Sequence, residues 1–217
     1  MKEKVSPTQK VLNLWAVVLI LWSIYRATFK TDLPVWFDEF ILKPFVFIFP
    51  VYWFIKNVEK KHFFSSIDLR LKRLPADIIL GGVVGIIFLV IGYVGALTRS
   101  HKFSMPELGV SFALTVAIAL ATAISEEILS RGFVLKRLYQ ESHNLVSSIG
   151  LSSVLFFVLH IPILFTIEYV TGAMLLQVMV TDILLSFAIS LLYLDRKSLL
   201  LPIIVHMFYA LSLSLFM

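Results

Sequence analysis

Residues 125–132, SEEILSRG, follow directly on the uncharged run 110–124, which is long enough to cross much of a bilayer. A charge at the centre of a membrane helix costs about 2.5–3.5 kcal/mol on insertion scales, so such residues are rare and usually functional. On a helix, Glu127 and Arg131 are spaced i,i+4 with the acid first, which favours an ion pair. Glu126 points about 100° away from that pair. The stretch therefore predicts one structural and one working carboxylate, unless both acids merely mark the end of a membrane helix.

The composition around this stretch is that of an integral membrane protein. Of 217 residues, 59% are hydrophobic and 15% charged, and the mean hydropathy is +0.92, so we expect a single polytopic domain over residues 1–217. The chain has no cysteine, which excludes disulfides, thiol nucleophiles and cysteine metal sites. The net charge of +5 comes from basic residues that flank apolar runs, which indicates the lipid bilayer rather than nucleic acid as a partner.

The hydropathy pattern predicts an all-α fold, a polytopic transmembrane helix bundle of about seven spans, with six to eight as the range. Five glycines in the third apolar run permit close helix packing. The expected spans are residues 11–29, 40–55, 77–97, a fourth helix that opens at Pro106 or Glu107 and carries the two glutamates, 145–165, 171–194 and 199–217.

Basic residues near the spans predict how these helices meet the membrane surface. Lys43, near the start of the second span, is expected to extend toward the interface. The basic segment 56–76 is interpreted as lying on anionic lipid, with a solvated loop as the alternative. Of the 19 Lys and Arg residues, 14 lie at the N-terminus and after spans two, four and six. This bias predicts a plasma-membrane protein whose N-terminus is cytoplasmic and whose C-terminus lies outside.

Three ionisable residues in different spans are predicted to lie at similar depth. Glu126 precedes the turn at His143 by 17 residues and His160 follows it by 17, while His206 lies about 12 Å into the last span at 1.5 Å rise per residue. A carboxylate and an imidazole at one point can hold and deprotonate a water, and a second imidazole can stabilise an oxyanion. We therefore expect a hydrolytic site in the cytoplasmic half of the bilayer. Taken singly, each histidine has a plainer interpretation, a hydrogen bond to a neighbouring helix.

The same three residues are acceptable zinc ligands by type, but the chain has no His-Glu-x-x-His or comparable paired spacing. The sequence thus predicts no certain cofactor and gives a divalent metal only weak support. Asp182 is another acid inside a span, and we expect it to pair with a Lys, Ser or Thr group.

Three short motifs resemble those of a known family. They are Glu126-Glu127-x-x-x-Arg131-Gly132, then Phe156-x-x-x-His160, then His206 at the end of the LPIIVH stretch 201–206. In this order, over about residues 105–210, they are similar to the CAAX protease and bacteriocin-processing (CPBP or Abi) family of intramembrane proteases. The resemblance implies a glutamate-dependent endopeptidase in which Glu126 and His160 activate water, Glu127 pairs with Arg131, and His206 helps form the oxyanion hole. The chain departs from the family at Ala210, where the family has an Asn that donates to the oxyanion.

Three functions follow as hypotheses. The first is an endopeptidase acting on a membrane protein or peptide that enters from the cytoplasmic side or laterally from lipid; its oligomeric state is left open. The second is a non-catalytic protein on the same scaffold, either a bacteriocin self-immunity factor or a regulator of a membrane signalling protein. Ala210 favours the second, whereas Glu126, His160 and Arg131 oppose it. The third, a small transporter with a proton relay, is disfavoured because the chain has no detectable internal repeat.

Overall fold

The computed structural model describes residues 5–29, 34–70, 73–99, 109–164 and 172–216, and within these ranges the chain forms helices and no strands. The prediction of an all-α membrane helix bundle is confirmed. The predicted opening of the fourth helix at Pro106 or Glu107 lies outside the described residues. The elements are α1 (Pro7–Ile24) with η1 (Tyr25–Phe29), α2 (Val35–Phe37) with η2 (Asp38–Leu42), η3 (Pro44–Ile48) and α3 (Phe49–Asn57), α4 (Phe63–Ser66), α5 (Leu74–Arg99), α6 (Val110–Glu127) with η4 (Ile128–Leu135) and α7 (Lys136–Ser142), α8 (Leu145–Leu164), α9 (Gly172–Arg196) and α10 (Leu200–Phe216), where η denotes a π-helical segment.

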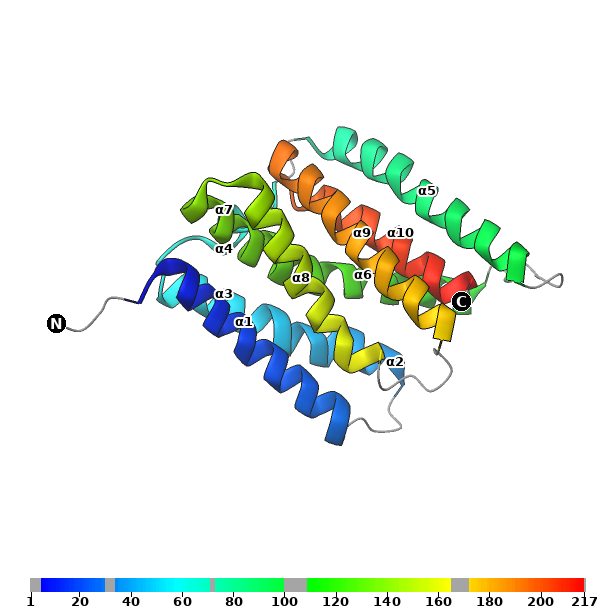
Figure 1. The fold of residues 1–217 in the computed structure, drawn as a ribbon, viewed down its shortest axis with the longest axis horizontal. Helices are drawn as coiled ribbons and strands as arrows, with labels where there is room; N and C mark the ends of the chain where they lie inside the picture. Colours follow the sequence, from blue (N-terminus) through cyan, green and yellow to red (C-terminus); the bar gives the residue numbers. More distant parts are fainter. Residues whose placement is uncertain (1–4, 30–33, 71–72, 100–108, 165–171, 217) are drawn as a thin grey trace.

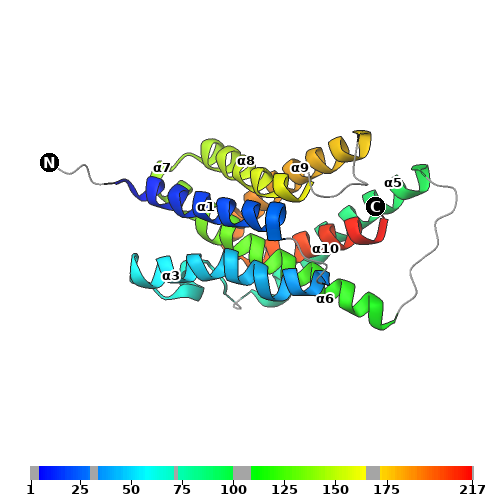
Figure 2. The ribbon, with the colours of Figure 1, turned by 90° about the horizontal axis from the view of Figure 1, so that it is seen from below.

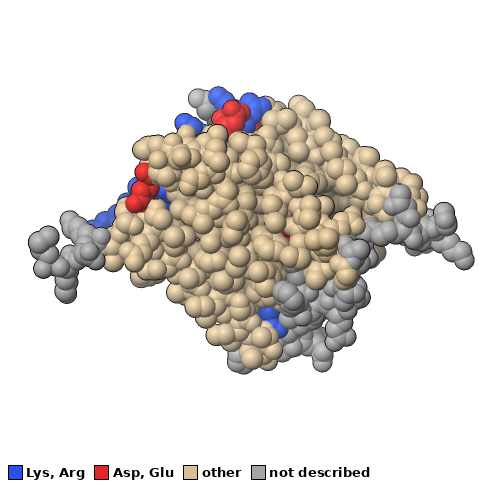
Figure 3. Space-filling model, in the orientation of Figure 1, with Lys and Arg blue, Asp and Glu red and all other residues tan. Residues whose placement is uncertain are grey.

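Five helices in the described part of the chain are long and apolar enough to cross a membrane, judged by length and composition: Pro7–Thr28, Leu74–Leu97, Val110–Ser142, Leu145–Pro162 and Leu175–Arg196. Helix α10 is apolar but shorter, and the run from α2 to α3 is helical but carries charges and two prolines. Large apolar side chains of α5, such as Ile79 and Val83, are more than half exposed. Figure 3 shows a broad face almost free of charged side chains, which gather at its rim. Such a surface needs lipid around it.

The helical runs pack side by side and alternate in direction. Helix α10 contacts α5, α6 and α9, α8 contacts α9, and α1 contacts α3, α7 and α8. Figure 1 shows this order across the bundle, from α5 at one edge to α1 at the other, and Figure 2 shows α8 and α9 on one side with α3 and α6 on the opposite side. The start of α1 and the end of α10 lie at opposite ends of the bundle.

Glycines on one face of α5 allow it to approach α10 closely. A Cβ atom built on Gly81 would lie 2.9 Å from the Cβ of Ile204, and one on Gly85 would overlap the ring of Phe208. Gly82, on another face, has open space beside it. Small residues at such a contact are what membrane helices use in place of a hydrophobic driving force. The predicted role of the glycines in close packing is confirmed at this seam.

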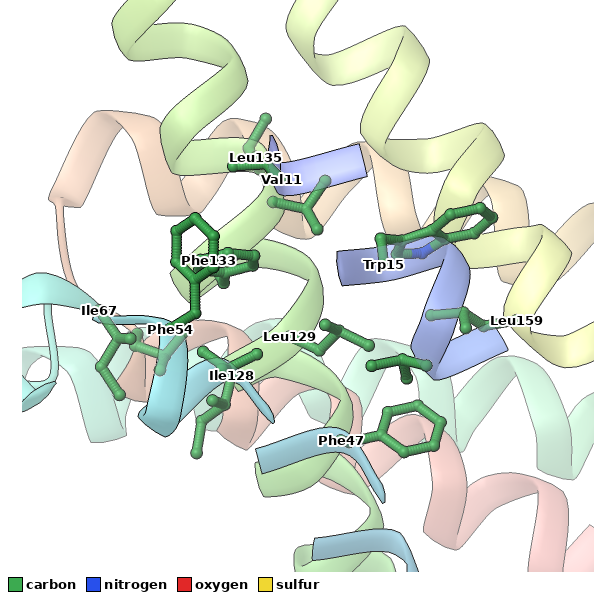
Figure 4. Close-up of a cluster of buried hydrophobic side chains, with 14 of the residues drawn as sticks. Val11, Trp15, Phe47, Phe54, Ile67, Ile128, Leu129, Phe133, Leu135 and Leu159 are labelled. Atoms are coloured by element: carbon green, nitrogen blue, oxygen red, sulfur yellow. The ribbon is translucent and has the colours of Figure 1, made fainter. Parts of the chain in front are cut away.

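The main apolar core joins the first two helical runs to the segment that follows the glutamates. Figure 4 shows Trp15, Phe47, Leu129, Phe133 and Leu159 converging from α1, η3, η4 and α8. All five are buried. Since the core is built partly from η4, it fixes the segment that directly follows the two glutamates.

Part of the basic segment 56–76 packs into the end of the bundle. Its helix, α4, spans only four residues, and Phe64 in it is 64% exposed. Ile67 is fully buried against Gly132, while the adjacent Asp68 accepts hydrogen bonds or ion pairs from neighbouring helices. Within residues 56–70, the segment therefore packs on the bundle end through Ile67 and Asp68, and whether it also lies on anionic lipid stays a prediction.

Candidate active site

The two glutamates stand where the helix changes its winding. Glu126 and Glu127 are the last residues of α6, and η4 continues the same helix with π geometry before α7 resumes the α form. All eight residues of η4 are buried. A π-helical segment inside an α-helix is rare and is frequently found at functional sites. No pattern in the sequence predicted this change of winding.

The structure brings the three residues predicted for the site together. Glu126 Oε2 lies 3.2 Å from Nε2 of His160 on α8 and 3.6 Å from Nε2 of His206 on α10. Glu126 and His206 are almost fully buried, and the side chain of His160 retains 17% exposure. The matched depths expected from helix lengths are thus present, although the catalytic roles of these residues remain predictions.

Hydrogen bonds determine which face of each imidazole points at the carboxylate. Nδ1 of His160 lies 3.0 Å from the carbonyl oxygen of Phe156, and because a carbonyl only accepts, this nitrogen carries the hydrogen. Nδ1 of His206 donates in the same way to Glu127 Oε1 at 2.7 Å. In their neutral forms both rings therefore direct an Nε2 lone pair toward Glu126 Oε2. These tautomers are assigned from the hydrogen-bond network. All three atoms are then acceptors, and a water near this oxygen could donate its two hydrogens to two of them, which is enough to hold it.

Glu127 and Arg131 form the predicted ion pair, with Nη1 of Arg131 2.8 Å from Glu127 Oε1. Both side chains are fully buried. Nη2 of Arg131 donates to the hydroxyl of Ser186 on α9 at 2.7 Å, and its guanidinium stacks 4.2 Å from the ring of Phe156. Glu127 Oε1 thus accepts from both Arg131 and His206, so the pair also orients the second imidazole.

Lys43 is the residue that the sequence analysis misplaced. The prediction that it extends to the interface is wrong, because its side chain is 2% exposed and its Nζ lies 2.8 Å from Glu126 Oε1 and 2.8 Å from Glu39 Oε2. Glu39 in turn accepts a hydrogen bond from the hydroxyl of Thr122 at 2.7 Å. The i,i+4 spacing of Glu39 and Lys43 inside an apolar run could have indicated that Lys43 belongs to a buried site. An ionisable pair within a membrane span marks a functional site by default.

Asp182 has a partner of a type that was not predicted. The hydroxyl of Tyr209 donates to Asp182 at 2.6 Å, so the expectation of a direct Lys, Ser or Thr partner is wrong. Ser212 donates to the backbone carbonyl of Phe88 at 3.1 Å. Tyr209 and Ser212 are the hydroxyl residues nearest in sequence to Ala210, and both are engaged elsewhere. Neither supplies the oxyanion donor that the family has at position 210.

Among the residues that the structure describes, no group of three or more His, Cys, Asp or Glu side chains has the arrangement of a metal site. The Glu126 cluster contains, in addition, two cationic side chains, those of Lys43 and Arg131. The chain itself therefore places one carboxylate oxygen and two imidazole nitrogens around one point. The cations of Lys43 and Arg131 pair with the two glutamates of this cluster.

Comparison with known proteins identifies a family over the second half of the chain. Residues 108–212 match the family model described as type II CAAX prenyl endopeptidase Rce1-like. The matched range contains Glu126, His160 and His206, and the resemblance to CAAX proteases drawn from the three motifs is confirmed. No curated protein and no solved structure matches the chain. The matched family is one of endopeptidases, so peptide hydrolysis is the general class of activity that the match supports.

Proposed function

We propose that this protein, a membrane helix bundle that matches the Rce1-like prenyl endopeptidases over residues 108–212, is an intramembrane glutamate-dependent endopeptidase. The observation that carries the proposal is the convergence of two imidazole Nε2 atoms on Glu126 Oε2 at 3.2 and 3.6 Å. This oxygen is buried and makes no hydrogen bond of its own. An unsatisfied buried carboxylate oxygen facing two imidazoles is a site prepared for a further polar atom.

In the proposed reaction a water lies beside Glu126 Oε2 and His160 Nε2, within hydrogen-bond distance of both atoms. One water proton passes to Glu126, the other is held by the lone pair of His160, and the hydroxide oxygen bonds to the carbonyl carbon of the scissile peptide. The carbonyl oxygen becomes an oxyanion. When the C–N bond breaks, the proton held by Glu126 passes to the leaving nitrogen, which gives a carboxyl group and an amine. Glu126 returns to its ionised form.

His206 is placed to stabilise the oxyanion. Its Nδ1 already donates to Glu127, so it offers a second donor at Nε2 only as an imidazolium, and the carboxylate of Glu127 stabilises that form. Three carboxylates (Glu39, Glu126, Glu127) and two permanent cations (Lys43, Arg131) surround the site.

The proposed substrate is a membrane protein or membrane-associated peptide in the plasma membrane. The basic residues at the N-terminus and after every second span support a cytoplasmic N-terminus and a site in the cytoplasmic half of the bilayer. Anionic lipid at that surface is the partner expected for the basic bundle end. These assignments follow from charge placement and not from the family match.

A second candidate is a non-catalytic protein on the same scaffold, acting in bacteriocin self-immunity or regulating a membrane signalling protein. The observation that favours it is the engagement of the Tyr209 and Ser212 hydroxyls, which leaves the departure at Ala210 uncompensated. Removing one oxyanion donor lowers kcat by about 10²–10³-fold and does not abolish it, so the first proposal accommodates this departure.

The test compares the wild type with Glu126→Ala and His160→Ala, expressed at equal levels in a strain lacking the protein. New peptide termini in the membrane and secreted fractions are mapped by mass spectrometry. Termini that appear only with the wild type are the expected result, and they also identify the substrate. Identical profiles for the three proteins, together with rescue of the deletion phenotype by both variants, would overturn the proposal in favour of a binding protein.

A further inference from the structure

The two oxygens of Glu126 are held differently. Oε2 faces the two imidazoles, whereas Oε1 lies 2.8 Å from the ammonium of Lys43. A carboxylate with neither oxygen held can rotate about its last bond and turn either oxygen toward a water. With Oε1 engaged by a buried ammonium, Oε2 is left as the free oxygen and its direction is defined. Lys43 therefore contacts the proposed base on the side away from the reacting atoms.

Lys43 is itself fixed by a closed set of contacts. Both oxygens of Glu39 accept from its Nζ, at 3.0 and 2.8 Å, and Thr122 donates to one of them. Thr122 lies on α6 one turn before Glu126, so the chain of contacts leaves the helix at Thr122 and returns to the same helix at Glu126. The ring of Trp22, 5.6 Å away on α1, covers the ammonium from a third side.

Lys43, Glu39 and Trp22 lie outside the matched range 108–212. The first two helical runs thus reach into the centre of the site and do more than cover it. A purely structural lysine needs one carboxylate to neutralise its charge. Glu39 already does so, because both of its carboxylate oxygens accept hydrogen bonds from Lys43 Nζ. The additional contact with Glu126 costs the burial of another charge and is explained if it orients that charge.

We propose that Lys43 is a positioning residue for the reaction: its ammonium, anchored by Glu39 and Thr122, holds Oε1 of Glu126 so that Oε2 faces the water and both imidazoles. The inference rests on the proposed endopeptidase function. It assigns a part of the site to a region that the family match does not reach, and it predicts that the first two helical runs are needed for turnover as well as for folding.

The kinetic test uses an internally quenched peptide built around the cleavage site found by terminus mapping, with full-length protein in proteoliposomes. Lys43→Met lowers kcat by about 10–10²-fold and changes KM by less than about twofold, because orientation of the base is lost and substrate contacts are not. Lys43→Arg, which keeps the charge, recovers part of kcat. Lys56→Met is the matched control, an exposed lysine of the same helical run that contacts Tyr52, and it leaves kcat unchanged.

A double variant separates positioning from folding. Lys43→Met with Glu39→Gln removes the buried cation together with its partly buried anionic partner, so its thermal stability recovers part of the loss caused by Lys43→Met alone. If Lys43 positions Glu126, kcat of the double variant stays low. Recovery of kcat together with stability would overturn the inference and assign Lys43 a structural role only.

A spectroscopic arm needs no substrate and separates this inference from the proposed function. The carboxylate stretching bands of Glu126 are isolated by subtracting the infrared spectrum of Glu126→Gln from that of the wild type. These bands shift in Lys43→Met and not in Lys56→Met if Lys43 holds the carboxylate. If the bands shift but the protein yields no cleavage products, the proposed endopeptidase function is overturned and the contact between Lys43 and Glu126 stands. If the bands do not shift, the proposed role of Lys43 is overturned whatever the activity of the protein.

Discussion

Two clusters of charged side chains in this bundle use similar residues in opposite ways. The central cluster consists of Glu39, Lys43, Glu126, Glu127, Arg131, His160 and His206, and the end cluster of Glu59, Ser66, Asp68, Lys136 and Arg137. In the end cluster, Arg137 donates from Nε and Nη2 to both oxygens of Glu59 and from Nη1 to the carbonyls of Ser66 and Gly132. Every nitrogen of this guanidinium has an acceptor, which is the pattern of a structural clasp.

The central cluster is less fully satisfied although it is more deeply buried. Glu126 Oε2, Glu127 Oε2 and Nε of Arg131 are buried and make no hydrogen bond. Leaving a buried polar atom unpaired costs about 1–3 kcal/mol, so stability alone would not retain three of them. The difference between the clusters teaches that burial of charge does not distinguish a binding site from a structural ion pair, whereas a carboxylate oxygen that faces two imidazoles and makes no hydrogen bond does.

The largest expected effect contrasts the glutamates of the two clusters. Glu126→Gln removes the proposed base and keeps the side-chain shape, so we expect kcat to fall by about 10²–10⁴-fold with the bundle still folded. Glu59→Gln breaks the clasp and leaves kcat within about twofold. Both are measured on the quenched peptide, with thermal unfolding as the control for folding. Equal loss of activity in the two variants would remove the distinction between site and clasp.

The next effect contrasts the arginines in stability. Arg131→Met leaves Glu127 fully buried without its cation and should lower the free energy of unfolding by about 3–5 kcal/mol. Arg137→Met should cost less, because Glu59 is partly exposed and keeps Lys61 within 3.8 Å. Thermal unfolding in one detergent gives both values. Adding Glu127→Gln to Arg131→Met should recover part of the loss, and failure to do so would indicate that the stacking on Phe156 dominates.

A third prediction sharpens the view that the central cluster lacks one donor. Ala210→Asn restores the residue of the family motif one turn after His206, and we expect kcat to rise by up to about 10²-fold. Ser214→Asn introduces the same side chain one turn further along α10, at an exposed position, and should leave kcat unchanged. A rise in both variants, or in neither, would contradict the idea that position 210 faces the oxyanion.

The convergence of Glu126, His160 and His206 was predictable because it depends on local geometry. Two helices joined by a short turn at His143 place residues at equal distances from the turn at equal depth, and the sequence contains both distances. The ion pair of Glu127 with Arg131 was predictable for the same reason, since i,i+4 spacing suffices.

The contacts that were missed depend on how distant runs pack. Lys43 reaches Glu126 only because the second helical run lies against α6, and nothing in its own neighbourhood specifies that contact. The π-helical winding of η4 and the pairing of Tyr209 with Asp182 likewise follow from packing of whole helices. A long side chain such as that of Lys43 can extend either toward the membrane interface or into the bundle. The position of the residue in its helix does not decide between these two directions.

The smallest expected effect concerns the pH dependence of the end cluster. Partial burial raises the pKa of Glu59, but the hydrogen bonds and charge of Arg137 outweigh it and hold that pKa below its usual value. A depressed pKa in the folded state means that Glu59 contributes stability at pH values above the ordinary pKa of a glutamate, and that this contribution is lost as the pH falls through the folded pKa. Because the pair is partly exposed, we expect Glu59 to contribute no more than about 1 kcal/mol to the free energy of unfolding.

The thermal stabilities of the wild type and Glu59→Gln should therefore differ near pH 7 and converge in acid, whereas exposed Asp195→Asn should show no such convergence. Equal stabilities already at pH 7 would mean that Arg137 is held by the backbone carbonyls and not by Glu59, and the end cluster would then owe its stability to neutral acceptors.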